Sequence, residues 1–137
     1  MKFKTLNGAF KTVKKPHKYV IDWEGKSRSK LQKKVKDFLF PFWENKVVFE
    51  EFPVAGTRLS VDIFNATDSI AIEVQGEQHV KYTPFFHGNN KYNYIDQLKR
   101  DHDKRKFLLI NKITFIEVYF NDDLNKNLFK KQGVKLI

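Results

Sequence analysis

The sequence predicts an α/β protein with one small mixed sheet flanked by helices, and three observations carry this prediction. The chain has 137 residues, which suits one domain. Hydrophobic residues make up 41% of the chain, including 14 Phe, which is enough apolar surface for one core. The spacing of the apolar residues alternates between helical and strand periods in the order α-β-β-β-α-β.

The first helix is expected over residues 29–42, where Leu31, Val35 and Leu39 fall on one face. Ser27 or Ser29 can cap its start, and Pro41 marks its approximate end. The remaining elements of the predicted domain, residues 27–137, follow in chain order: strands at 47–52, 59–64 and 69–75, a helix at 93–111, a strand at 113–120 and a short helix near 124–130.

Residues 1–26 are expected to form a basic N-terminal arm with a short strand at 17–23. Charge is distributed unevenly beyond this arm. Residues 1–46 hold 13 Lys and Arg against 4 acids, residues 47–98 hold 3 against 7, and residues 99–137 hold 10 against 5. An acidic centre between basic arms favours a polyanion partner together with a metal, although a solvated basic surface would also explain the arms.

Composition excludes several classes of site. The chain has no Cys, so disulfides, thiolate zinc sites and cysteine nucleophiles are absent. It contains no apolar run of about 18 residues and no signal-peptide pattern at Met1–Asn7, so no membrane association and a cytoplasmic location are expected.

Two acids interrupt the strands that are most apolar. Asp62 lies in the run 59–64 and Glu73 in the run 69–75. If these strands pair as a hairpin, both carboxylates can project from one side of the sheet, where like charge and burial make them unfavourable. A divalent cation relieves both, and oxygen ligands suit Mg²⁺ or Mn²⁺. The alternative is a pair of ordinary edge-strand acids, solvated or paired with Lys.

The spacing of these residues resembles a known nuclease signature. Asp62, a gap of ten residues and then Glu73-Val74-Gln75 resembles the PD-(D/E)xK motif, with Gln in place of the usual Lys. The segment "EVQGEQH" and the later "DHDK" resemble motifs of small phage-encoded, freestanding homing-type endonucleases and of the very-short-patch repair endonuclease group. The resemblance covers about residues 27–120 and implies an αβββαβ restriction-endonuclease-like core.

That resemblance implies roles for individual residues. Asp62 and Glu73 would bind the Mg²⁺ (or Mn²⁺), helped by the carbonyl of Val74. Gln75 takes the position of the catalytic Lys, and Lys104 could compensate for its missing charge. On a helical projection Asp101 and Lys104 fall on one stripe facing the sheet, although a surface ion pair between them explains the pattern equally well.

Further candidates lie near this motif. His79 follows the second acidic strand and is a candidate general base or phosphate contact, or else a loop histidine bonded to the backbone. Glu50 and Glu51 alternate along a strand, so one is expected to face the site, and Glu51 is preferred as a further ligand. Gln32 on the first helix is a further candidate, although a solvated helix face explains it as well.

A DNA-binding surface is predicted from basic and loop residues. The aromatic residues of 82–92 could stack on bases, or could close one end of the core instead. The predicted DNA contacts are Lys14, Lys15, Lys30, Lys33, Lys34, Lys81, His87 and Lys91.

Together these residues predict a Mg²⁺-dependent DNA endonuclease that hydrolyses phosphodiester bonds. The resemblance favours a phage homing or nicking enzyme acting on double-stranded DNA in the cytoplasm of a bacterial host. A homodimer is expected if both strands are cut. The alternatives are a repair or junction-resolving nuclease on the same fold, an RNA-processing factor, and an inactive DNA-binding protein derived from the fold, since Lys is missing at position 75.

Overall fold

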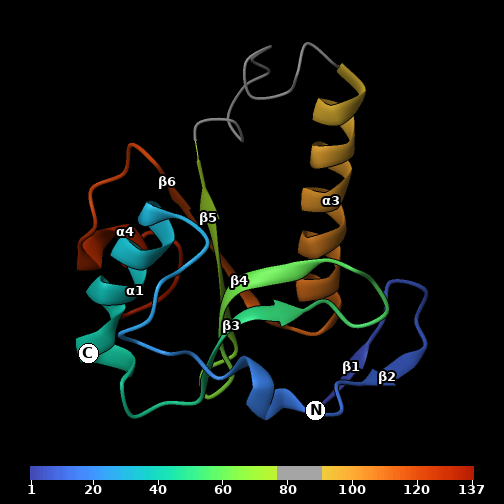
Figure 1. Ribbon diagram of the computed structural model, residues 1–137, viewed down its shortest axis with the longest axis horizontal. Helices are drawn as coiled ribbons and strands as arrows, with labels where there is room; N and C mark the ends of the chain where they lie inside the picture. The colour runs from blue at the N-terminus through green and yellow to red at the C-terminus, as the bar shows by residue number, and fades with distance from the viewer. Residues whose placement is uncertain (77–90) are drawn as a thin grey trace.

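The computed structural model describes residues 1–76 and 91–137 of the chain (Figure 1). The elements are β1 (Lys2–Lys4), β2 (Phe10–Thr12), the 3₁₀ helix η1 (Pro16–Tyr19), α1 (Lys30–Trp43), β3 (Val48–Pro53), β4 (Ser60–Asn65), β5 (Ile70–Gln75), α3 (Lys91–Ile110), β6 (Thr114–Tyr119) and α4 (Lys126–Lys130).

The central sheet has the strand order β3-β4-β5-β6. The first three strands are antiparallel, whereas β6 runs parallel to β5, with α3 as the connection between them. Figure 1 shows α1 and α4 on one side of the sheet and α3 on the other. The predicted mixed α/β fold with helices around one sheet is therefore confirmed. None of the described helices is long and apolar enough to cross a membrane.

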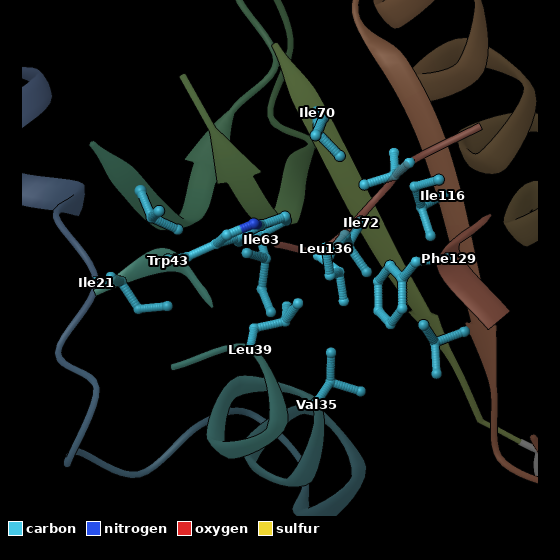
Figure 2. Close-up of a cluster of buried hydrophobic side chains, with 13 residues drawn as sticks. Ile21, Val35, Leu39, Trp43, Ile63, Ile70, Ile72, Ile116, Phe129 and Leu136 are labelled. Carbon is cyan, nitrogen blue, oxygen red and sulfur yellow. The ribbon is translucent and has the colours of Figure 1, made fainter. Parts of the chain in front are cut away.

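The α1 side of the sheet is covered by aliphatic packing (Figure 2). Val35 and Leu39 of α1 are fully buried and point towards Ile63 and Ile72 of the central strands. These residues follow the helical spacing that predicted α1. Ser29 caps the helix by accepting a hydrogen bond from the backbone N–H of Gln32 at 3.1 Å. α1 ends at Trp43, two residues beyond Pro41.

The α3 side of the sheet is covered mainly by phenylalanine. The ring of Phe3 lies 5.7 Å from that of Phe52, 6.3 Å from that of Phe64 and 5.6 Å from that of Phe107. The first two are edge-to-face contacts, a favourable geometry for aromatic rings. Phe3 belongs to β1, so the predicted N-terminal arm contributes a side chain to the core.

The predicted strand at 17–23 is wrong. Pro16 begins a 3₁₀ turn in its place, because the proline ring fixes φ at a helical value and removes an N–H. The segment reaches the sheet through a bridge from Val20 to Phe49, a hydrogen bond from the Ile21 N–H to the Val48 carbonyl at 3.0 Å, and an edge-to-face contact between the rings of Tyr19 and Phe52.

Two neighbouring leucines of α3 test the packing of this helix. Leu108 is 1% exposed and Leu109 is 79% exposed. Leu108→Ala should lower the free energy of unfolding by about 2–5 kcal/mol, because it leaves a cavity against the sheet. Leu109→Ala, the matched control, should change it by less than about 0.5 kcal/mol. Equal effects in urea denaturation would contradict this placement of α3.

Candidate active site

Asp62 of β4 and Glu73 of β5 form a buried carboxylate pair, 7% and 4% exposed. Backbone pairing between these strands extends to Ile63 and Ile72, the residues next to the two acids. Beyond that point, the two side-chain carboxylates accept hydrogen bonds from backbone N–H groups. The Asp62 N–H donates to Glu73 Oε2 at 2.8 Å, and the Val74 N–H donates to Asp62 Oδ2 at 2.8 Å. Each acid is thus fixed by the backbone of the opposite strand.

The pair is electrostatically strained. Burial raises the pKa of Glu73 to about 8, the charge of Asp62 adds to the rise, and Lys104 opposes it. Burial also raises the pKa of Asp62, against the lowering effects of the Val74 N–H and of Lys104. Two acids this close titrate as a unit. Near neutral pH we infer that they share one proton, which a bound cation could replace.

Lys104 of α3 contacts this pair directly. Its Nζ lies 2.7 Å from Glu73 Oε1, and both side chains are largely buried. This placement agrees with the helical projection, which put Lys104 on the side of α3 that faces the sheet. Asp101, one turn earlier, is half-buried and also makes an interaction.

A cavity of about 370 Å³ opens beside the pair. It lies between α1, the strands and α3, and it collects several of the predicted site residues. Those that line it are Gln32, Asp62, Glu73, Val74, Gln75 and Lys104. Arg28 and Phe120 also line it and were not predicted, since nothing in their sequence surroundings distinguishes them from other exposed residues.

Gln32 connects this cavity to both glutamates of β3. Its Nε2 donates to Glu50 Oε2 at 2.8 Å and to Glu51 Oε1 at 3.0 Å. The expected alternation of Glu50 and Glu51 is therefore wrong, because both face α1. Glu51 has a φ of +53°, a left-handed backbone value that breaks the regular alternation of side chains along the strand.

Glu51 interacts electrostatically with the carboxylate pair, because its negative charge contributes to the raised pKa of Asp62. Arg28 forms an ion pair with Glu51, with 2.7 Å between Arg28 Nη2 and Glu51 Oε2. Glu50 instead accepts from the fully buried Lys36 at 3.1 Å. Lys36 was not predicted as a buried residue, although its four-residue spacing from Gln32 places both on one side of the helix.

Gln75 is buried beside the pair but faces another acid. Its Nε2 donates to Glu117 Oε2 at 3.2 Å, and the Tyr119 hydroxyl donates to the same oxygen at 2.8 Å. Arg105 of α3 forms an ion pair with Glu117, with 2.6 Å between Arg105 Nη2 and Glu117 Oε1. Glu117 was missed, because only the parallel register, which pairs it with Glu73, brings it near the site.

The predicted DNA contacts divide into three groups. Lys14, Lys15, Lys30 and Lys34 are exposed. Lys33 is engaged, since its Nζ donates to Asp37 Oδ1 at 2.6 Å and to the Trp23 carbonyl at 3.0 Å. The remaining predictions lie outside the residues or side chains that the structure describes: His79, Lys81, His87 and the side chain of Lys91.

Within residues 1–76 and 91–137, no group of three or more His, Asp or Glu side chains is arranged to hold a metal ion. The described carboxylate pair is thus a two-acid site. Such a donor set fits Mg²⁺, which retains several waters and commonly binds through one or two carboxylates plus substrate phosphates.

Similar chains occur in two viruses. The protein is similar to Uncharacterized protein 033L of Invertebrate iridescent virus 3, with 34% identity over 88 residues, which cover 64% of this chain and 45% of the viral protein. It is also similar to Uncharacterized protein 307L of Invertebrate iridescent virus 6, with 32% identity over 97 residues, which cover 66% and 49%. The chain thus spans about half the length of the curated relatives it matches. No protein-family model and no solved structure matches it.

The raised pKa of Glu73 predicts an unusual pH dependence of stability. Between about pH 4.5 and about pH 8, the folded protein retains a proton on Glu73. The unfolded chain, with a glutamate pKa of 4.5, has already released this proton in that window. The free energy of unfolding should therefore fall as pH rises across this window, by up to about 1 kcal/mol per pH unit.

Urea denaturation from about pH 5 to pH 8 checks this dependence on wild type and Glu73→Gln. The wild-type slope should be steeper than that of Glu73→Gln. Asp68→Asn is the control, because Lys46 lowers the pKa of Asp68 and its titration lies below this window. Identical slopes for wild type and Glu73→Gln would show that Glu73 is ionised throughout.

Proposed function

We propose that this protein is a metal-dependent DNA endonuclease with a restriction-endonuclease-like αβββαβ core. The observation that carries the proposal is the cavity in which Asp62, Glu73 and Gln75 from adjacent strands meet Lys104 from α3. The element order supports it, because α1, three antiparallel strands, α3 and a parallel β6 follow one another as this core requires.

The residues fit a divalent cation. Asp62 and Glu73 would hold it, with the Val74 carbonyl as the additional ligand that the resemblance implies. A bound Mg²⁺ or Mn²⁺ would polarise a phosphoryl group and lower the pKa of a bound water. The raised pKa values of both acids support this role. A carboxylate pair that retains a proton because its charges repel would bind a cation in place of that proton.

Lys104 would supply the positive charge that Gln75 lacks. In the described state its ammonium group neutralises Glu73 at 2.7 Å, inside the same cavity. With a cation on the carboxylates, Lys104 is free to hydrogen bond to a phosphate oxygen and to stabilise charge that develops in the transition state. Gln75 is a positioning residue by contrast, because its amide contacts Glu117.

Double-stranded DNA is the proposed substrate. The formal charge of +10 favours a polyanion, and acids outnumber Lys and Arg only in residues 47–98, the segment that supplies Asp62 and Glu73. A homing or nicking role remains our proposal for its biology, and the occurrence of similar chains in two viruses supports a virus-encoded enzyme. Cleavage of both strands would need two copies of so small a chain.

Nicking of supercoiled plasmid tests the activity. Wild type should nick with Mg²⁺ or Mn²⁺ and not with EDTA. Asp62→Asn and Glu73→Gln should each lower the rate by at least about 100-fold, because they remove charge from the metal site at nearly constant volume. Lys104→Met should lower kcat by about 100-fold and leave metal affinity largely unchanged.

The control is Asp123→Asn, an exposed acid outside the cavity, which should nick at the wild-type rate. DNA binding without metal-dependent nicking by wild type would reject the nuclease and support the alternative of an inactive DNA-binding protein. Nicking that survives in both Asp62→Asn and Glu73→Gln would place the active site elsewhere.

A further inference from the structure

A second cavity, here called the basic groove, has a volume of about 430 Å³ and lies apart from the candidate active site. One wall runs from Lys11 to Lys15, which includes the end of β2, and continues with Lys18 and Tyr19 of η1. The other wall is Pro53–Thr57, the turn between β3 and β4. The two cavities share no lining residue.

The charge of the basic groove is of one sign. Lys11, Lys14, Lys15 and Lys18 line it, and no acid does. Four other lysines of the described residues, Lys33, Lys36, Lys46 and Lys104, are each paired with a carboxylate. No ion pair is found for the four groove lysines among the described residues. Four ammonium groups around one hollow repel each other, and an anion with several charges would relieve that repulsion.

The basic groove continues into a neighbouring cavity of about 360 Å³ that shares Lys11 and Ala55–Thr57 with it. The neighbouring cavity is lined in part by Phe10, which is 63% exposed. The ammonium groups of Lys2 and Lys4 lie 4.9 and 5.7 Å from the centre of its ring. A row of cations suits the successive phosphates of a nucleic acid backbone better than it suits a small inorganic anion.

Close packing holds the two walls together. Gly56 has a φ of +85°, and a Cβ added there would lie 3.1 Å from Cγ2 of Thr5 on the hairpin. Glycine at this turn therefore permits the backbone conformation and the close approach of the hairpin. The groove is thus a formed feature of the fold.

The groove lies at the end of the sheet that carries the active site. Pro53 on its wall pairs with Ser60, and Asp62 follows two residues later on the same strand. The wall of the groove and the active-site residue Asp62 thus belong to the same pair of strands. We propose that the basic groove binds the phosphodiester backbone of DNA at phosphates other than the one cleaved. The identity of this ligand rests on the proposed nuclease function.

Fluorescence anisotropy with a short labelled DNA duplex in EDTA tests the groove without cleavage. The triple variant Lys14→Gln, Lys15→Gln, Lys18→Gln removes three groove cations. The matched control, Lys130→Gln, Lys131→Gln, Lys135→Gln, removes three exposed cations outside the groove and changes the net charge equally. All six side chains are exposed, so both variants should fold, and circular dichroism checks this.

The groove variant should bind DNA at least about tenfold more weakly, and its slope of log K against log salt should be smaller by about 3 between about 50 and 200 mM NaCl. The control should stay within about threefold of wild type. Equal losses in the two variants would reduce the effect to net charge and overturn the groove. Unchanged binding by the groove variant would also overturn it.

Inorganic phosphate should compete with DNA only in the millimolar range, because it contacts a single part of the groove. Competition at micromolar phosphate would assign the groove to a small anion and overturn DNA as its ligand. Failure of the nuclease proposal has a different signature, since it appears as absent nicking with Mg²⁺ while binding in EDTA still depends on the groove lysines.

Discussion

The structure depends on how two buried carboxylates are accommodated at the point where β4 and β5 cease to pair through their backbones. Asp62 accepts the N–H of Val74, and Glu73 accepts the N–H of Asp62. The hydrogen bonds offset part of the desolvation of each acid, but they leave the two carboxylates adjacent in a buried part of the sheet. The ion pair with Lys104 offsets part of this charge, and the raised pKa values of both acids favour retention of a proton by the pair.

This constraint explains why several elements converge on one place. α3 crosses from β5 to the parallel strand β6, and the crossing brings Lys104 against Glu73. α1 covers the other side and supplies Gln32, whose amide connects the two glutamates of β3 to the cavity. A sheet with apolar residues at positions 62 and 73 would need none of these contacts. These contacts are the structural basis of the catalytic role proposed for the two acids.

The sequence was sufficient for features that depend on local periodicity and insufficient for those that depend on register. The helical stripe predicted α1, and the apolar runs predicted the four strands of the sheet. It could not foresee the left-handed backbone of Glu51, which turns Glu50 and Glu51 to the same side, or the 3₁₀ turn that replaces the strand at 17–23. Asp62 and Glu73 were recognisable because acids are conspicuous in apolar strands. Glu117 was not, since its proximity to Gln75 arises only from the parallel pairing of β5 with β6.

Calorimetric titration of the protein with Mn²⁺ near pH 7, in buffers of different ionisation enthalpy, tests most directly whether the carboxylate pair exchanges its proton for a metal. We expect one bound ion, release of a substantial fraction of one proton per ion, and loss of binding in both Asp62→Asn and Glu73→Gln. Absence of binding in wild type, or binding that releases no proton and survives both substitutions, would contradict this exchange.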